Sequence, residues 1–218
     1  MSTVVAIDGP AGAGKSTVAR KVADHLHYAY INTGSLYRAI ALAAKEAGVN
    51  LQSIDEKFLN TLKLEYKDGN LLLNGIDPGQ ALRTSDIAQG ASIVSSQKIV
   101  REYLLPVQRK AAEQNWIVME GRDIATVVFP DALCKLFVTA SIEERARRRL
   151  LQDGEMKQDA TLEDVIKEIE ERDTRDSQRD IAPLKCANDS ILIDTTGLTI
   201  EQVLNKIINI ISPIMQQN

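Results

Sequence analysis

The sequence has few of the side chains on which metal centres and disulfide frameworks depend. Its 218 residues include two cysteines and two histidines. Cys134 and Cys186 lie far apart, with no Cys-x-x-Cys spacing, which argues against a disulfide scaffold or a zinc site. We expect both thiols to be reduced, as is usual in the cytosol. His25 and His27 lie in or beside the first predicted helix, where we expect a structural or surface role without a metal.

Long apolar runs and an excess of positive charge are also absent. No apolar stretch approaches the ~20 residues that a helix needs to cross a bilayer, and no basic segment before an apolar run marks a signal peptide. The 26 lysines and arginines are outnumbered by 30 aspartates and glutamates, which argues against a general nucleic-acid binder. We therefore expect a cytoplasmic protein without a nucleic-acid or membrane partner, and nothing in the sequence requires an oligomer.

Short β-branched runs alternate with amphipathic helices along most of the chain. Strands are predicted at 4–7, 116–119, 135–138 and 191–193, with a fifth near 29–31. This alternation is typical of an α/β fold in which helices cover both faces of a parallel five-stranded sheet. We expect a single domain over residues 1–218.

Residues 62–95 depart from this pattern. Strict alternation over Leu62–Tyr66, the turn signal Asp68-Gly69 and the apolar run Leu71–Leu73 together predict a β-hairpin. A helix at about 85–95 follows. Because an antiparallel hairpin does not belong inside a parallel layer, we predict a small insert at about 62–95 on one side of the core.

Residues 9–16 read Gly-Pro-Ala-Gly-Ala-Gly-Lys-Ser and fit the phosphate-binding pattern G-x-x-x-x-G-K-[ST] at each fixed position. Glycines let the backbone approach a phosphate, and successive amides and the following helix N-terminus then face the anion. Lys15 reaches the β- and γ-phosphates, and the Ser16 hydroxyl is placed to bind Mg²⁺. The predicted ATP-binding residues of the loop are Gly9, Pro10, Ala11, Gly12, Ala13, Gly14, Lys15, Ser16 and Thr17.

The rest of the chain narrows the class of P-loop protein. The Asn-Lys-x-Asp motif of GTPases is missing, and the chain is short for an ATPase motor, which leaves a small phosphotransferase. Glu120-Gly121-Arg122-Asp123 directly follows the predicted strand at 116–119. Ligands of open α/β sheets bind beyond the carboxyl ends of the strands, so we expect Arg122 and Asp123 to face the phosphates. A turn with a surface ion pair is the alternative interpretation.

Two helical segments each carry charged side chains on one face. They are Arg145, Arg148 and Arg149, and then Arg172, Asp176 and Arg179. Solvated helices with internal ion pairs are the alternative. Beside a P-loop, these faces predict a lid at about 145–180 that closes over the transferring phosphate, because guanidinium groups pair with phosphoryl oxygens and stabilise transition-state charge.

The sequence offers no obvious general base beside these arginines. An acceptor phosphate has a second pKa of about 6 and is already an anionic nucleophile at neutral pH. The pattern therefore favours a phosphate acceptor over an alcohol.

Together these segments resemble the nucleoside monophosphate kinases, and among them the cytidylate kinases of bacteria. The matching stretches are 7–15, 33–38, 121–130 and 172–184, in order through nearly the whole chain. The resemblance implies transfer of the ATP γ-phosphate to CMP or dCMP with Mg²⁺, within pyrimidine nucleotide metabolism. A P-loop kinase of another small metabolite, such as a sugar or a shikimate-like alcohol, is the alternative, and a non-catalytic nucleotide sensor is a third hypothesis.

The resemblance also implies roles for particular side chains. Arg38 and Arg122 would meet the acceptor phosphate, and Arg148 would lie on the ATP side. The implied catalytic residues are Lys15, Arg122 and Arg148. The implied substrate-binding residues are Thr33 and Arg38 for the nucleotide, Ser92, Arg101 and Asp123 for cytosine, Arg172 and Asp176 for ribose or phosphate, and Arg179 near the same pocket.

The chemistry of cytosine fits these residue types. A carboxylate such as Asp123 accepts from the N4 amino group, and Arg101 or Ser92 can donate to the ring acceptors. Uracil has an oxygen at position 4, so the same carboxylate would face another acceptor. Many members of the family have Asp-Gly-Arg-Asp where this chain has Glu120 first, which leaves open whether the longer side chain contacts the Mg²⁺ shell.

Overall fold

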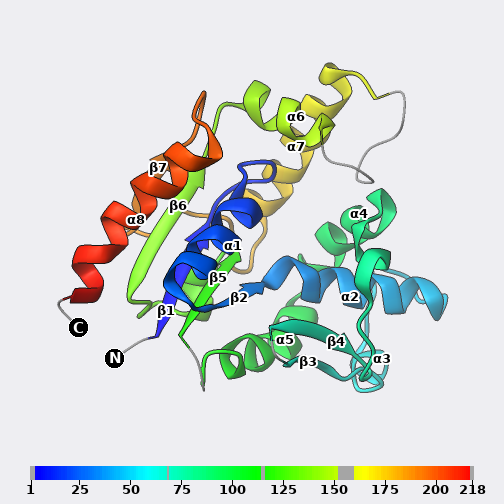
Figure 1. The fold of residues 1–218 in the computed structure, drawn as a ribbon. Helices are drawn as coiled ribbons and strands as arrows, with labels where there is room; N and C mark the ends of the chain where they lie inside the picture. Colours follow the sequence, from blue (N-terminus) through cyan, green and yellow to red (C-terminus); the bar gives the residue numbers. More distant parts are fainter. Residues whose placement is uncertain (1–2, 68, 114–115, 152–159, 217–218) are drawn as a thin grey trace.

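The computed structural model describes residues 3–67, 69–113, 116–151 and 160–216. A five-stranded parallel sheet forms its centre (Figure 1). In spatial order the strands are β2 (Ala29–Asn32), β5 (Ile117–Gly121), β1 (Val4–Asp8), β6 (Cys134–Thr139) and β7 (Ile191–Asp194). The predicted parallel α/β fold is confirmed, including the fifth strand near residue 29.

The central strand β1 is buried on both faces, as its continuous apolar run requires. Val5 and Ile7 pack with the helices α1 (Lys15–Leu26) and α8 (Ile200–Gln216), whereas Val4 and Ala6 pack on the opposite face with Ile124. The alternation of side chains along a strand thus divides the core into two layers. No helix in the part of the chain that the structure describes is long and apolar enough to pass through a bilayer.

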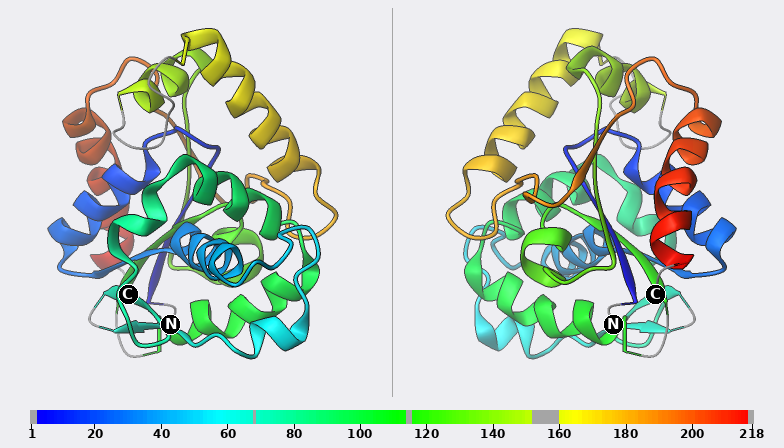
Figure 2. Two further views of the ribbon diagram at one scale, coloured as in Figure 1. Left: turned by 90° about the vertical axis from the view of Figure 1, so that its right-hand side faces the viewer. Right: turned by 90° about the vertical axis from the view of Figure 1, so that its left-hand side faces the viewer.

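A further apolar cluster lies beside the sheet and includes Leu36, Leu59 and Leu104. The elements that build it face the viewer in Figure 2, left. They are α2 (Thr33–Glu46), α3 (Glu56–Leu59), β3 (Leu64–Lys67), β4 (Asn70–Leu73), the 3₁₀ helix η1 (Gly79–Arg83), α4 (Ser85–Val94) and α5 (Lys98–Lys110). The strands β3 and β4 pair antiparallel, as the predicted hairpin requires, although Asp68 of its turn lies outside the described residues.

Three more elements frame the carboxyl ends of the strands. They are the π-helical turn η2 (Ile124–Val128), α6 (Ile142–Leu150) and α7 (Leu162–Gln178). The helices α6 and α7 pack against each other through Ala146, Val165 and Ile169, above the P-loop in Figure 1. Within the predicted lid, residues 152–159 lie outside the described part of the chain.

Candidate active site

The phosphate-binding loop runs from the end of β1 to the start of α1, as its motif predicts. Gly9 has a φ of 148°, and a Cβ at this position would lie 1.9 Å from the carbonyl oxygen of Val138 on β6. Only glycine lets the chain leave the sheet here. The loop then turns so that α1 begins at Lys15, with its amino end directed to the space above the sheet.

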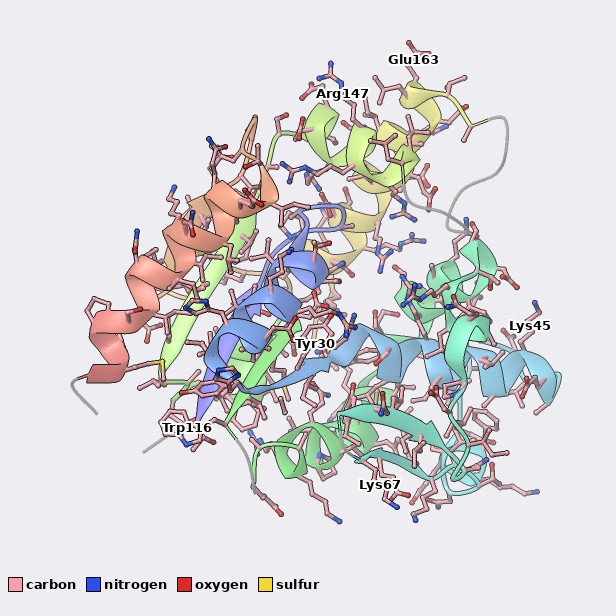
Figure 3. All side chains as sticks on the ribbon, in the orientation of Figure 1. Tyr30, Lys45, Lys67, Trp116, Arg147 and Glu163 are labelled. Carbon is pink, nitrogen blue, oxygen red and sulfur yellow. The ribbon has the colours of Figure 1, made fainter. Side chains whose placement is uncertain are left out.

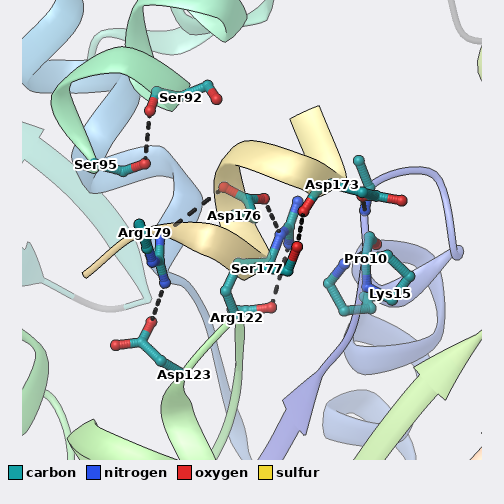
Figure 4. Close-up of polar contacts among 12 residues, drawn as sticks. Pro10, Lys15, Ser92, Ser95, Arg122, Asp123, Asp173, Asp176, Ser177 and Arg179 are labelled. Atoms are coloured by element: carbon teal, nitrogen blue, oxygen red, sulfur yellow. Dashed lines mark hydrogen bonds and ion pairs between the residues drawn. The ribbon is translucent and has the colours of Figure 1, made fainter. Parts of the chain in front are cut away.

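Lys15 is buried inside this loop. Its Nζ donates a hydrogen bond to the carbonyl oxygen of Pro10 at 2.7 Å (Figure 4). Burial and the neighbouring Arg122 guanidinium hold the pKa of Lys15 well below its usual value, and the Glu120 carboxylate opposes them. A cation confined among other cations at the loop is in a position to gain stability from a bound polyphosphate.

The helices α6 and α7 hold the tip of the loop directly. Asp173 Oδ1 accepts from the Ala11 amide at 3.3 Å, and Arg145 donates to the Ala11 carbonyl at 3.1 Å and to Asp173. Arg145 was predicted as part of a phosphate-facing lid, but its guanidinium here binds the loop backbone. Asp173 was not predicted, and its only signal was its place in an Arg/Asp-rich run.

Arg148 on α6 contacts its own helix and the residue that follows β7. Its guanidinium donates to Glu144 at 2.9 Å and to the Thr195 hydroxyl and carbonyl at 2.9 and 2.8 Å. A weaker contact of 3.5 Å reaches the Ala13 carbonyl. Thr195, which follows β7 and is buried, was not predicted.

Asp123 is the centre of a buried ionic cluster at the carboxyl end of β5. Its Oδ2 accepts from Arg101. Its Oδ1 lies 3.5 Å from Arg179, as Figure 4 shows. Arg101 also donates to the Ser95 carbonyl at 3.0 Å. These side chains come from α5, the end of β5 and the end of α7, so three elements distant in sequence converge on one carboxylate.

Asp176 extends the cluster toward the P-loop. Arg122 Nε donates to Asp176 Oδ2 at 2.9 Å, and Arg179 lies 3.9 Å from its other oxygen. Burial opposes ionisation of Asp176, but Arg122, Arg172 and Arg179 outweigh it and lower its pKa. Burial and the neighbouring Arg122 lower the pKa of Arg172 to about 10. The arginines therefore repel one another, which an anionic ligand between them would relieve.

Three buried polar atoms of the predicted site have no hydrogen-bond partner within the described part of the chain: Ser92 Oγ, Arg172 Nε and Arg179 Nη2, the last of which lies 3.5 Å from Asp123 Oδ1. Buried polar atoms are normally paired, so these atoms are available to a bound ligand. A pocket of about 360 Å³ opens at Ser92 and reaches Arg175 on α7.

The two remaining predicted substrate residues lie on α2. The Thr33 hydroxyl donates to the Glu120 carbonyl at 2.8 Å, which ties the start of α2 to β5. Arg38 donates to the Leu82 carbonyl of η1 at 2.9 Å. Arg38 therefore ties α2 to η1 within the apolar cluster that lies beside the sheet.

Asp8 is a buried acid that the motif analysis missed. Its carboxylate accepts from the amides of Ile124 at 3.0 Å and Ala125 at 2.8 Å, directly after Asp123. Burial raises its pKa to about 6, and the two backbone hydrogen bonds oppose that rise. Asp8 thus fixes the backbone that presents Arg122 and Asp123. An aspartate that closes an otherwise apolar buried strand was the available signal.

Among the residues that the structure describes, no group of three or more His, Cys, Asp and Glu side chains could hold a metal ion by itself. The Ser16 hydroxyl at the start of α1 and the buried Glu120 carboxylate are hard oxygen donors, the type that Mg²⁺ prefers. This donor set suits a metal whose remaining ligands come from nucleotide phosphates and water.

The parallel sheet, the G-x-x-x-x-G-K-S loop after β1 and the arginines gathered opposite it define a kinase of the P-loop class. Solved shikimate kinases share the fold: that of Bacteroides thetaiotaomicron has a TM-score of 0.53 at 11% identity, covering 96% of this chain and 98% of that one. The Acinetobacter baumannii enzyme, solved with shikimate, has a TM-score of 0.50 at 15% identity, covering 96% and 93%. Such low identities show the fold alone.

Sequence comparison is more specific. The family model described as cytidylate kinase matches residues 5–213. A cytidylate kinase of Bacillus cereus is 44% identical over 214 residues, and one of Thermosipho melanesiensis is 46% identical over 207 residues, each covering 95% of both chains. The chain belongs to the cytidylate kinase family, as the resemblance in its sequence indicated.

Proposed function

We propose that this protein transfers the γ-phosphate of ATP to CMP or dCMP, giving ADP and CDP or dCDP in pyrimidine nucleotide metabolism. The observation that carries the proposal is the buried Asp123 carboxylate held by Arg101, with the unpaired Ser92 Oγ as a further polar group. Asp123 accepts from the cytosine amino group, and Arg101 and Ser92 donate to its ring acceptors.

The acceptor phosphate binds among the arginines, with Arg38 and Arg122 as its main partners. Asp176 and Arg172 contact the ribose or the same phosphate, and Arg179 lies near the same pocket. The acceptor phosphate is anionic at neutral pH and attacks without a general base. Positioning and charge stabilisation then supply the catalysis.

On the donor side, the loop from Gly9 to Thr17 holds the ATP phosphates. Lys15 neutralises charge on the β- and γ-phosphates, and Arg148 stabilises the donor from the ATP side. The Ser16 hydroxyl would hold Mg²⁺ together with the phosphates, and the metal would supply further neutralisation of the phosphate charge. These three side chains, Lys15, Ser16 and Arg148, come from α1 and α6.

We also propose that the single domain over 1–218 has two parts that adjust to ligands. The insert at about 62–95 adjusts when the acceptor base binds, and the lid at about 145–180 adjusts when the phosphates bind. Closure removes water and brings the arginines to the transferring group. The protein works in the cytoplasm on small-molecule substrates, and its reaction requires no oligomer.

The test is ADP production with Mg-ATP and each of CMP, dCMP, UMP, AMP and GMP, with shikimate as an alcohol acceptor. Strong turnover with CMP and dCMP, weak turnover with UMP and none with purine nucleotides is the expected result. Turnover with shikimate but with no nucleotide would refute the proposal.

A further inference from the structure

One phenol joins three elements of the candidate site. Tyr30 on β2 lies beside α1 near the centre of the molecule (Figure 3). Its hydroxyl donates to Glu120 Oε1 and accepts from Asn32 Nδ2 at 3.4 Å, and the Ser16 side chain lies near enough to influence the pKa of the phenol. A single oxygen therefore contacts the ends of β2 and β5 and lies near the first turn of α1.

The ring that carries this oxygen is also held in place. Arg20 lies on α1 one turn after Ser16, and its guanidinium carbon is 4.6 Å from the centroid of the Tyr30 ring. A phenol has an ordinary pKa of about 10, so the Tyr30 hydroxyl is protonated at neutral pH and remains a donor to Glu120.

Glu120 is a carboxylate that needs such a partner. It is 3% exposed and lies close enough to Lys15 to oppose the lowering of the lysine pKa. A buried carboxylate is costly unless it is paired and hydrogen-bonded. The Tyr30 hydrogen bond fixes which way the carboxylate points, next to the loop whose Ser16 hydroxyl is the predicted metal ligand.

We propose that Tyr30 is a positioning residue for the metal-bound phosphates, and that it acts by holding the Glu120 carboxylate beside Ser16. The inference rests on the proposed function only in requiring that the P-loop binds a nucleotide with Mg²⁺. Partners that orient metal ligands through hydrogen bonds typically change metal affinity or activity by about 10–100-fold. A tyrosine that only filled space would not alter the dependence on Mg²⁺.

The substitution Y30F removes the one oxygen and keeps the ring. The half-saturating Mg²⁺ concentration for turnover should rise about tenfold, while the KM for CMP stays within a factor of about two. Y28F is the matched control, because the Tyr28 hydroxyl lies 3.6 Å from the Met215 sulfur, away from the P-loop. Y28F should leave the Mg²⁺ dependence unchanged, and the melting temperatures of the two variants show whether stability alone is involved.

Calorimetric binding of ADP gives a readout without turnover. Y30F should weaken ADP binding about tenfold in the presence of Mg²⁺ and leave it unchanged in EDTA, which also shows that the loop is folded. If no nucleotide serves as acceptor, this measurement still tests Tyr30 separately from the proposed reaction.

A double-mutant cycle with E120A tests whether Tyr30 influences the Mg²⁺ dependence through Glu120. Y30F should change the Mg²⁺ dependence less than about twofold in the E120A background, since its partner is already gone. The proposal is overturned if Y30F matches Y28F in both assays. It is also overturned if the full tenfold effect persists without Glu120.

Discussion

Arg101 and Asp123 form an ion pair in which both side chains are almost fully buried. The pair holds the carboxylate that we propose reads cytosine in one orientation. Such preorganisation lowers the cost of binding, because the site does not need to order these groups when the base arrives. It also makes each partner sensitive to loss of the other.

The substitution D123N should reduce kcat/KM for CMP about a hundredfold, the scale expected when one partner of a buried hydrogen-bonded charge pair is lost. Asparagine can also donate to the O4 of uracil, so the preference for CMP over UMP should shrink. D189N is the control, since Asp189 pairs with Lys135 on the exposed surface. An unchanged CMP-to-UMP ratio in D123N would contradict the proposed base reading.

K15M should lower kcat about 10²–10³-fold, as expected for removing one donor to the transition-state charge. Lys15 is buried with its pKa depressed, so methionine should leave the melting temperature equal or higher. The exposed Lys21 on the same helix gives the control K21M, with normal kcat. A large loss of stability in K15M with little loss of kcat would show that the lysine is structural.

Asp8 should contribute a pH dependence of stability. Its pKa is about 6 in the folded protein against an ordinary value of 3.8, so the folded state binds more protons between these values. Its contribution to the free energy of unfolding is greatest below pH 4 and is lost as the pH rises through 6. The loss is about 3 kcal/mol in all, at about 1.36 kcal/mol per unit of pKa difference.

Urea unfolding of the wild type and D8N at pH 4 and pH 7 measures this effect. The free energy of unfolding of D8N relative to the wild type should rise by up to about 3 kcal/mol across that range. D24N, at an exposed position of α1, should show no comparable trend. A constant difference between D8N and the wild type would mean that Asp8 does not titrate in this window.

G9A should prevent folding or destabilise the protein by several kcal/mol, because its Cβ would overlap the Val138 carbonyl. Gly197 also has a positive φ, but a Cβ there would meet no atom within 4 Å. G197A should therefore lower the free energy of unfolding by only about 1–2 kcal/mol, which is the penalty for a left-handed backbone alone. Thermal unfolding of the two variants makes the comparison, and similar melting temperatures would contradict the steric explanation.

Local sequence signals were sufficient for the sheet and the P-loop. The strands are short β-branched runs, and the loop motif spans eight consecutive positions. Both can therefore be recognised from local sequence, without knowledge of distant contacts. Thr33, Arg38, Ser92 and Arg101 were assigned to the acceptor only through the family resemblance. Asp123, Arg101 and Arg179 come from separate elements, and no periodicity in the chain brings them together.

The residues that sequence reasoning missed act over long separations. Asp8 binds the backbone 116 and 117 residues away, and Asp173 binds the Ala11 amide 162 residues away. The position of Arg145 on its helix predicted a phosphate-facing lid residue, yet its guanidinium donates to the Ala11 and Ala140 carbonyls. Backbone partners carry no sequence signature, which is why such contacts need the structure.

The central claim is that the γ-phosphate passes to the phosphate of CMP. The most direct test is ³¹P NMR of the protein with Mg-ATP and CMP, which distinguishes a new phosphoanhydride from free phosphate. The account predicts that CDP and ADP appear in equal amounts as ATP and CMP disappear. Release of inorganic phosphate with CMP unchanged would contradict it, because the P-loop would then serve hydrolysis rather than transfer.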